Sequence, residues 1–169
     1  SIYFLIDKKN TAARENLHKF SDMLRYQLYE MNGDKIPIEK EIQYLKDYMD
    51  MQKLRKDEKK YVEFNGGPEV KDFSIEPLLL MPFVENAFKH ISHNNNENNF
   101  VKVNLSRANG SFTFLAENSK ENQRTTEAHG GIGLNNVKRR LELLYPGKHE
   151  LKINETENNF SVKLNLQLS

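Results

Sequence analysis

Hydrophobic residues change their spacing near residue 60, and this change limits the folds that the chain can adopt. Before residue 60, apolar side chains recur every three or four residues, which is typical of helices. After residue 60, short runs with apolar residues at alternate positions appear, which is typical of strands with one buried face. The chain therefore predicts a helical first part and a second part built on a β-sheet.

Two helices are expected in the first part, separated by the turn-forming sequence Asn32–Gly33–Asp34. Asn10–Thr11 can cap the first helix, and Pro37 suits the first turn of the second. The apolar positions are Leu17, Phe20, Leu24, Leu28 and Met31, then Ile38, Ile42, Leu45 and Met49. Two interpretations are open: a hairpin that buries this stripe, or an arm that pairs with another chain, because two helices alone make a thin core.

The second part combines strands with two helices. Strands are expected at 61–64, 100–105, 112–115, 151–153 and 160–166, with Asn109–Gly110 as a hairpin turn. One helix is expected over Leu78–Ile91, with Ser74 as its N-cap, and another after Gly133. This order predicts an α+β fold with a mixed, mostly antiparallel sheet covered on one face.

The composition excludes several classes of function. The chain of 169 residues has no cysteine, which excludes disulfides, thiol catalysis and Cys-ligated metals. Its 25 basic and 24 acidic residues provide no broad electrostatic attraction for nucleic acid. The longest apolar run, Leu78–Val84, is far shorter than the ~20 residues of a membrane-spanning helix. Since the chain begins within an apolar pattern at Ser1, we expect a preceding segment that could carry a membrane anchor.

Glu85–His90 places an acid, an amide, a base and an imidazole in an otherwise apolar helix. Helical spacing puts Asn86, Lys89 and His90 on one face. One interpretation is the solvent-facing stripe of an amphipathic helix. The other is a binding site, because amide and carboxylate oxygens suit Mg²⁺ and a lysine suits phosphate.

A second candidate is Gly130–Gly133, just before a helix. Glycines let backbone N–H groups approach a phosphate closely, and a helix N-terminus favours anions. A glycine turn that merely begins a helix is the alternative. The combination of Gly130–Gly133 with Glu85–His90, and with the polar segment 119–129 upstream, favours an anion site.

Four motifs resemble those of the LytS-type sensor histidine kinases, in the same order and nearly from end to end. Leu80–His90 resembles the asparagine box, and Gly131–Tyr145 resembles the second glycine box with its helix. Leu24–Tyr26 and Ile38–Arg55 are similar to the helical region that precedes the ATPase domain. The resemblance implies a GHKL-type (Bergerat) ATP-binding α/β sandwich over 61–169, preceded by a helical dimerisation and phosphotransfer arm over 1–60.

The same resemblance implies roles for individual residues. Asn86 would hold Mg²⁺, Lys89 and His90 would approach the phosphates of ATP, and Glu85 would orient the attacking group. Segment 119–129 would form a lid over the phosphates. The glycine box would contribute Gly131, Gly133 and Leu134 to the nucleotide site.

The sequence departs from the family at two places. The family's Asp-x-Gly-x-Gly box, whose Asp contacts adenine, corresponds to Leu115–Lys120, which has no glycine, so Glu117 or Asn118 would replace the Asp. The phosphoacceptor histidine motif is absent, so we expect it upstream and expect no autophosphorylation by this chain alone. The alternatives are a degenerate kinase-like domain that acts as a nucleotide-binding or scaffold module, and a stand-alone GHKL ATPase.

The resemblance also implies partners and a location. It predicts a homodimer in the full-length protein, a response regulator of LytTR type as the phosphoryl acceptor, and no direct contact with nucleic acid. It further predicts that the chain is the cytoplasmic domain of a bacterial inner-membrane protein.

Overall fold

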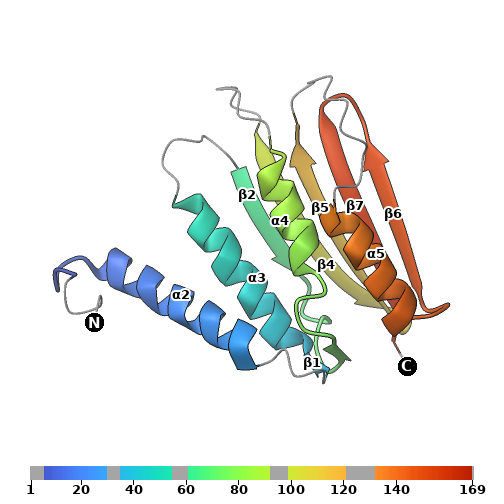
Figure 1. Ribbon diagram of the computed structural model, residues 1–169, viewed down its shortest axis with the longest axis horizontal. Coiled ribbons are helices and arrows are strands. Elements are labelled where there is room, and N and C mark those ends of the chain that lie inside the picture. Colours follow the sequence, from blue (N-terminus) through green and yellow to red (C-terminus); the bar gives the residue numbers. More distant parts are fainter. Residues whose placement is uncertain (1–5, 30–34, 55–60, 92–98, 121–131, 169) are drawn as a thin grey trace.

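The computed structural model describes residues 6–29, 35–54, 61–91, 99–120 and 132–168 (Figure 1). The helices are α2 (Thr11–Tyr29), α3 (Ile38–Lys53), α4 (Met81–Lys89) and α5 (Ile132–Leu144). The strands are β1 (Ile36–Pro37), β2 (Tyr61–Gly66), β3 (Ser74–Ile75), β4 (Phe100–Ala108), β5 (Ser111–Ser119), β6 (His149–Glu155) and β7 (Asn159–Gln167).

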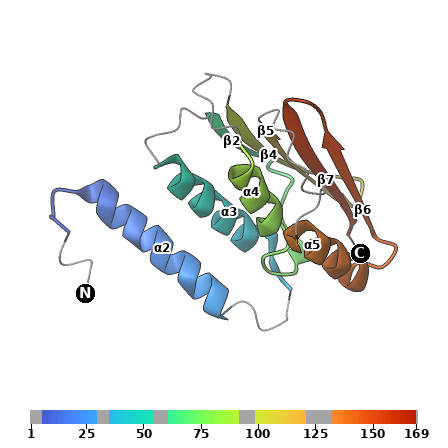
Figure 2. The same cartoon turned by 45° about the horizontal axis from the view of Figure 1, so that its top comes forward.

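The core lies between a five-stranded sheet and a layer of helices. The strand order is β2-β4-β5-β7-β6, with β2 parallel to β4 and every other pair antiparallel. Helices α3, α4 and α5 cover one face of this sheet, as both ribbon views show (Figures 1 and 2). Alternate residues of the central strands are therefore buried, among them Phe112 and Phe114 of β5. The predicted α+β fold with a mixed, mostly antiparallel sheet is confirmed.

The predicted hairpin between β4 and β5 is also confirmed. Asn109 and Gly110 both have positive φ, at +51° and +74°. A two-residue turn with two positive φ values matches the twist of the flanking strands, and asparagine and glycine adopt it most readily.

The predicted start of the asparagine-box helix is wrong. Ser74 does not cap it, because Ser74 and Ile75 form β3 and pair with Pro37 and Ile36 of β1. Helix α4 begins only at Met81, after Leu78, which has a φ of +55°. A left-handed residue interrupts a right-handed helix, so the apolar run divides into a loop and a shorter helix.

Helix α2 does not bury the apolar stripe that its sequence suggests. Phe20, Leu24 and Leu28 are 45%, 43% and 74% exposed, whereas Met23 and Tyr26 pack partly against the core. The interpretation that the hairpin buries this stripe is therefore wrong for these three residues. The expected cap is confirmed, since Asn10 Oδ1 accepts the Ala13 N–H at 3.1 Å.

Helix α3 belongs to the same core as the sheet. Ile38, Leu45 and Met49 are almost completely inaccessible to solvent and share one buried cluster with Phe83 and Phe114. The boundary at residue 60 between the arm and the ATP-binding domain stays a prediction. The packing itself joins α3 to the second part of the chain.

Candidate functional site

The polar residues of α4 lie on its solvent-accessible side. Phe83, Val84, Ala87 and Phe88 are buried against the sheet, whereas Glu85, Lys89 and His90 are exposed and Asn86 is half-buried. Incomplete hydration raises the pKa of the Glu85 carboxyl above its ordinary value. The helix ends at Lys89, and the C-cap residue His90 donates its N–H to the Asn86 carbonyl at 3.1 Å.

The end of β5 meets the end of α4 through Asn118. This side chain is completely buried, and its Nδ2 donates to the His90 carbonyl at 3.3 Å and to the Ser119 carbonyl at 3.0 Å. Its Oδ1 is buried and accepts no hydrogen bond from any described residue. Because both contacts of Nδ2 are to carbonyl groups, the amide orientation is defined and leaves the acceptor unused.

Glu117 is not brought into this site. Side chains alternate between the two faces of a strand, so Glu117 lies on the open face of the sheet and Asn118 on the face covered by helices. Its partners in the sheet are Lys102 of β4 and Ser161 of β7. Of the two residues that the sequence left open for the adenine contact, the geometry brings only Asn118 to α4.

The glycine-box helix α5 lies beside α4 on the same face of the sheet (Figures 1 and 2). Gly133 is exposed in its first turn, and a Cβ at Gly133 would meet no atom within 4 Å. Leu134 is buried in the core, so only its backbone remains to contact a ligand. Gly131 and most of the expected lid, 121–129, lie outside the described residues.

The sequence interpretation missed Glu41, a completely buried carboxylate on α3. It accepts hydrogen bonds from Tyr26, Leu78 and Leu80. A detectable feature was its position three residues after Ile38, on the face of the helix that the apolar spacing predicts to be buried.

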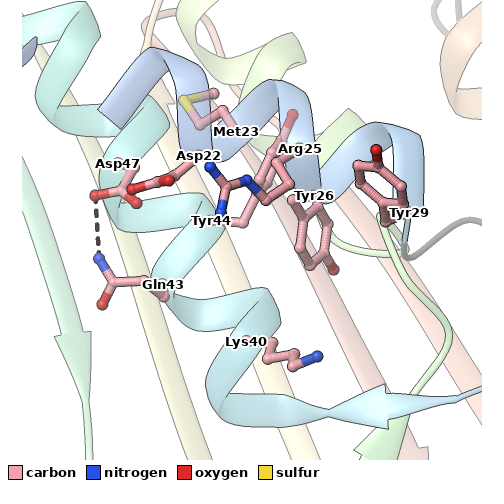
Figure 3. Close-up of a pocket in the computed structure, with 9 residues that line it drawn as sticks. All are labelled: Asp22, Met23, Arg25, Tyr26, Tyr29, Lys40, Gln43, Tyr44 and Asp47. Atoms are coloured by element: carbon pink, nitrogen blue, oxygen red, sulfur yellow. Dashed lines mark hydrogen bonds between the residues drawn. The ribbon is translucent and has the colours of Figure 1, made fainter. Parts of the chain in front are cut away.

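It also missed a groove between α2 and α3 with a cavity of about 320 Å³ (Figure 3). The lining residues are Asp22, Met23, Arg25, Tyr26, Tyr29, Lys40, Gln43, Tyr44 and Asp47. Burial raises the pKa of the Asp47 carboxyl, although a hydrogen bond from Gln43 opposes this. None of these residues belongs to the predicted nucleotide site.

Two further features bear on the site and on membranes. Within the described ranges, His, Asp and Glu side chains form no group of three or more that could hold a metal ion. Asn86 and Glu85 can thus offer a metal only a few oxygen ligands. Mg²⁺ accepts so few protein ligands when phosphates and water complete its shell.

No helix in the described part of the chain is long and apolar enough to cross a membrane.

The amino-acid sequence is similar to those of histidine kinases. The family model for histidine kinase matches residues 1–60. The sensor protein kinase HptS of Staphylococcus aureus is 27% identical over 109 residues, which are 64% of this chain and 21% of HptS. The chain therefore spans about a fifth of the length of the curated relatives it matches.

The solved structures share the fold. The histidine kinase domain of the blue-light activated histidine kinase EL346 from Erythrobacter litoralis superposes with a TM-score of 0.62 at 15% identity, covering 94% of this chain and 82% of that one. Full-length ShkA in complex with AMPPNP gives 0.59 at 14% identity, covering 94% of this chain and 38% of ShkA. The family match and the similarity to HptS confirm the resemblance to sensor histidine kinases, and the solved structures show that the fold is that of histidine kinase catalytic domains.

Proposed function

We propose that this chain, a relative of the sensor histidine kinases, is the ATP-binding catalytic region of such a kinase. In the full-length protein the γ-phosphoryl group of ATP would pass to a histidine upstream of this chain and then to a response regulator. The observation that carries this proposal is the buried Oδ1 of Asn118 beside the end of α4, which accepts no hydrogen bond from any residue that the structure describes.

A buried acceptor that no described residue satisfies favours a ligand with a donor, since a buried polar atom without a partner costs about 1–3 kcal/mol. The amino group of adenine is such a donor. Guanine presents a carbonyl oxygen at the corresponding position and would face Asn118 Oδ1 with a second acceptor. The contact therefore selects ATP over GTP, and the ShkA structure with AMPPNP, an analogue of ATP, supports a nucleotide in this fold.

The residues of α4 fit the phosphate end of the nucleotide. Asn86 would hold Mg²⁺ through its amide oxygen, and Lys89 and His90 add cationic and N–H groups at the end of the same helix. Bound Mg²⁺ would neutralise phosphate charge, which is the main requirement of phosphoryl transfer. Glu85 would orient the attacking group, and the first N–H groups of α5 at Gly133 would bind phosphate oxygens.

The exposed stripe of Phe20, Leu24 and Leu28 supports the expected homodimer of the full-length protein, because a second helix can bury it. By resemblance, the acceptor of the phosphoryl group would be a response regulator of LytTR type, and this chain would not bind nucleic acid directly. A membrane anchor upstream would make it the cytoplasmic domain of a bacterial inner-membrane protein.

One observation favours a degenerate scaffold as the second candidate. Where the family has glycines after the adenine contact, β5 continues to Ser119, and Lys120 forms an ion pair with Glu155 of β6. Regular strand structure and an ion pair restrict the backbone more than glycines do. Nucleotide binding decides between the two candidates.

The proposal predicts selective binding of adenine nucleotides. At a hundredfold its dissociation constant, ADP with Mg²⁺ should stabilise the chain by about 2.7 kcal/mol, and GDP should stabilise it much less. Asn118→Leu should remove this discrimination, because the acceptor is lost while the branching of the side chain is kept. Thermal unfolding with each nucleotide measures both effects. Absence of any shift with millimolar ADP would leave the scaffold as the better interpretation.

Gly133→Ala should separate folding from phosphate binding. A Cβ meets nothing within 4 Å, so the free energy of unfolding should stay equal or rise slightly with the higher helix propensity of alanine. Nucleotide affinity should fall severalfold, because the methyl group obstructs the approach of phosphate to the backbone. Urea unfolding and a nucleotide titration test the two effects. Gly66→Ala, at the end of β2, is the control for affinity, since a Cβ there makes only ordinary van der Waals contacts.

A further inference from the structure

The start of α4 is held by a carboxylate from another helix. The side chain of Leu80, the N-cap residue, makes no capping hydrogen bond. Instead, the Leu80 N–H donates to Glu41 Oε1 at 3.1 Å and the Leu78 N–H donates to Glu41 Oε2 at 2.9 Å. An anion is favourable at this position, because helix N-termini carry partial positive charge. Glu41 therefore sets the point at which the helix with Asn86 begins, about 9 Å along the axis from Asn86.

The loop before α4 is held from its other side by α5. Leu78 has a φ of +55°, which is unfavourable for a side chain of its size. Its carbonyl accepts a hydrogen bond from Arg140 Nη1 at 3.2 Å, and the Pro77 carbonyl accepts one from Arg140 Nη2 at 2.8 Å. Because Glu41 bonds the N–H of Leu78 and Arg140 bonds its carbonyl, the strained conformation is maintained. The two helices of the proposed nucleotide site thus meet at one loop.

The arm helix α2 reaches the same carboxylate. Tyr26 donates its hydroxyl to Glu41 Oε2 at 2.6 Å, the oxygen that also accepts the Leu78 N–H. The Tyr26 ring stacks on Tyr44 of α3 with ring centroids 4.6 Å apart, in the groove of Figure 3. No residue of α2 is buried, so a few contacts of this kind hold the helix in place.

The Glu41 charge depends on these donors. Burial raises the pKa of the Glu41 carboxyl, while the Tyr26 hydroxyl, the two backbone N–H groups and Arg140 oppose the rise. If α2 left, Oε2 would lose its shortest hydrogen bond and the carboxylate could turn toward water. The loop at Leu78 would then lose part of its support.

We propose that Glu41 is a positioning residue that couples docking of α2 to nucleotide binding at α4 and α5. The inference rests on the proposed function of α4 and α5 as the nucleotide site. Coupling between two equilibria is reciprocal. A nucleotide therefore strengthens docking of α2, and docked α2 strengthens binding of the nucleotide by the same factor.

The test compares Tyr26→Phe with Tyr29→Phe in the full chain. Tyr26→Phe removes the hydroxyl on Glu41 and keeps the ring on Tyr44, whereas Tyr29 lines the same groove and is 71% exposed. In the parent chain, saturating Mg-ADP should slow amide hydrogen exchange in α2 by about fivefold. Tyr26→Phe should lose this slowing and bind Mg-ADP about fivefold more weakly, and Tyr29→Phe should behave like the parent. Glu41→Gln should lose the coupling as well. Its amide NH₂ group would face either the Leu80 N–H or the Leu78 N–H and Tyr26 hydroxyl, which are all donors.

A purely structural role gives a different result. Tyr26→Phe would then speed exchange in α2 equally with and without Mg-ADP and leave the dissociation constant unchanged, which would overturn the inference. If the parent chain binds Mg-ADP without any change in the amide hydrogen exchange of α2, the inference is overturned and the proposed function stands. Parent chain that does not bind Mg-ADP would overturn both.

Discussion

Asn86→Ala should remove the Mg²⁺-dependent part of nucleotide binding and leave the fold intact. Asn86 is half-buried on the solvent-accessible side of α4, and alanine is the best helix former, so the free energy of unfolding should change by less than about 0.5 kcal/mol. Without the amide oxygen, the proposed ligand for Mg²⁺ is lost. The dissociation constant for Mg-ATP should rise at least about tenfold, toward the dissociation constant of ATP measured in the presence of a metal chelator.

Nucleotide titrations with Mg²⁺ and with chelator measure this effect in the parent and the variant. Asn16→Ala is a matched control, since Asn16 is also a half-buried helical asparagine but lies on α2. Equal Mg-ATP affinity in Asn86→Ala and the parent would disprove the role of Asn86 as a metal ligand. The polar face of α4 would then be the ordinary solvent-facing stripe that its periodicity also allows.

Periodicity and turn residues predicted most of the fold, because they report local preferences. The three-four spacing of Ile38, Leu45 and Met49 corresponds to the buried face of α3, and Asn109–Gly110 forms the expected turn. The alternation along β5 was visible too. Applied to Glu117 and Asn118, it would have assigned them to opposite faces of the sheet.

The parts that the sequence could not predict depend on contacts between distant residues. The run from Leu78 to Met81 is as apolar as a helix start, but Glu41, 37 residues earlier, takes the Leu78 N–H and Arg140 takes its carbonyl. Likewise, Phe20, Leu24 and Leu28 are apolar enough to be buried, yet their spacing does not indicate which partner would cover them. Local patterns give the elements, whereas long-range hydrogen bonds decide where α4 begins.

Asn118→Asp should destabilise the chain by about 3 kcal/mol at pH 7, although an Asp stands at the adenine contact in the resembled family. The reason is the surroundings of Nδ2, which donates to the carbonyls of His90 and Ser119. A carboxylate oxygen in its place would face two acceptors in a site without solvent. Urea unfolding at pH 7 measures the loss, and Asn104→Asp, on the open face of β4, should change stability by less than about 0.5 kcal/mol.

The pH dependence identifies the cause. Burial and the two carbonyls would raise the pKa of the introduced carboxyl in the folded chain above the ~3.9 of the unfolded chain. A raised pKa means that stability is retained below the unfolded value and lost as the pH rises through the folded value. The deficit of Asn118→Asp relative to the parent should therefore be largest at pH 7 and shrink toward pH 4, where the protonated carboxyl can donate to the His90 carbonyl. A deficit independent of pH, or none, would show that these two carbonyls do not fix the amide, and the assignment of Oδ1 to adenine would lose its basis.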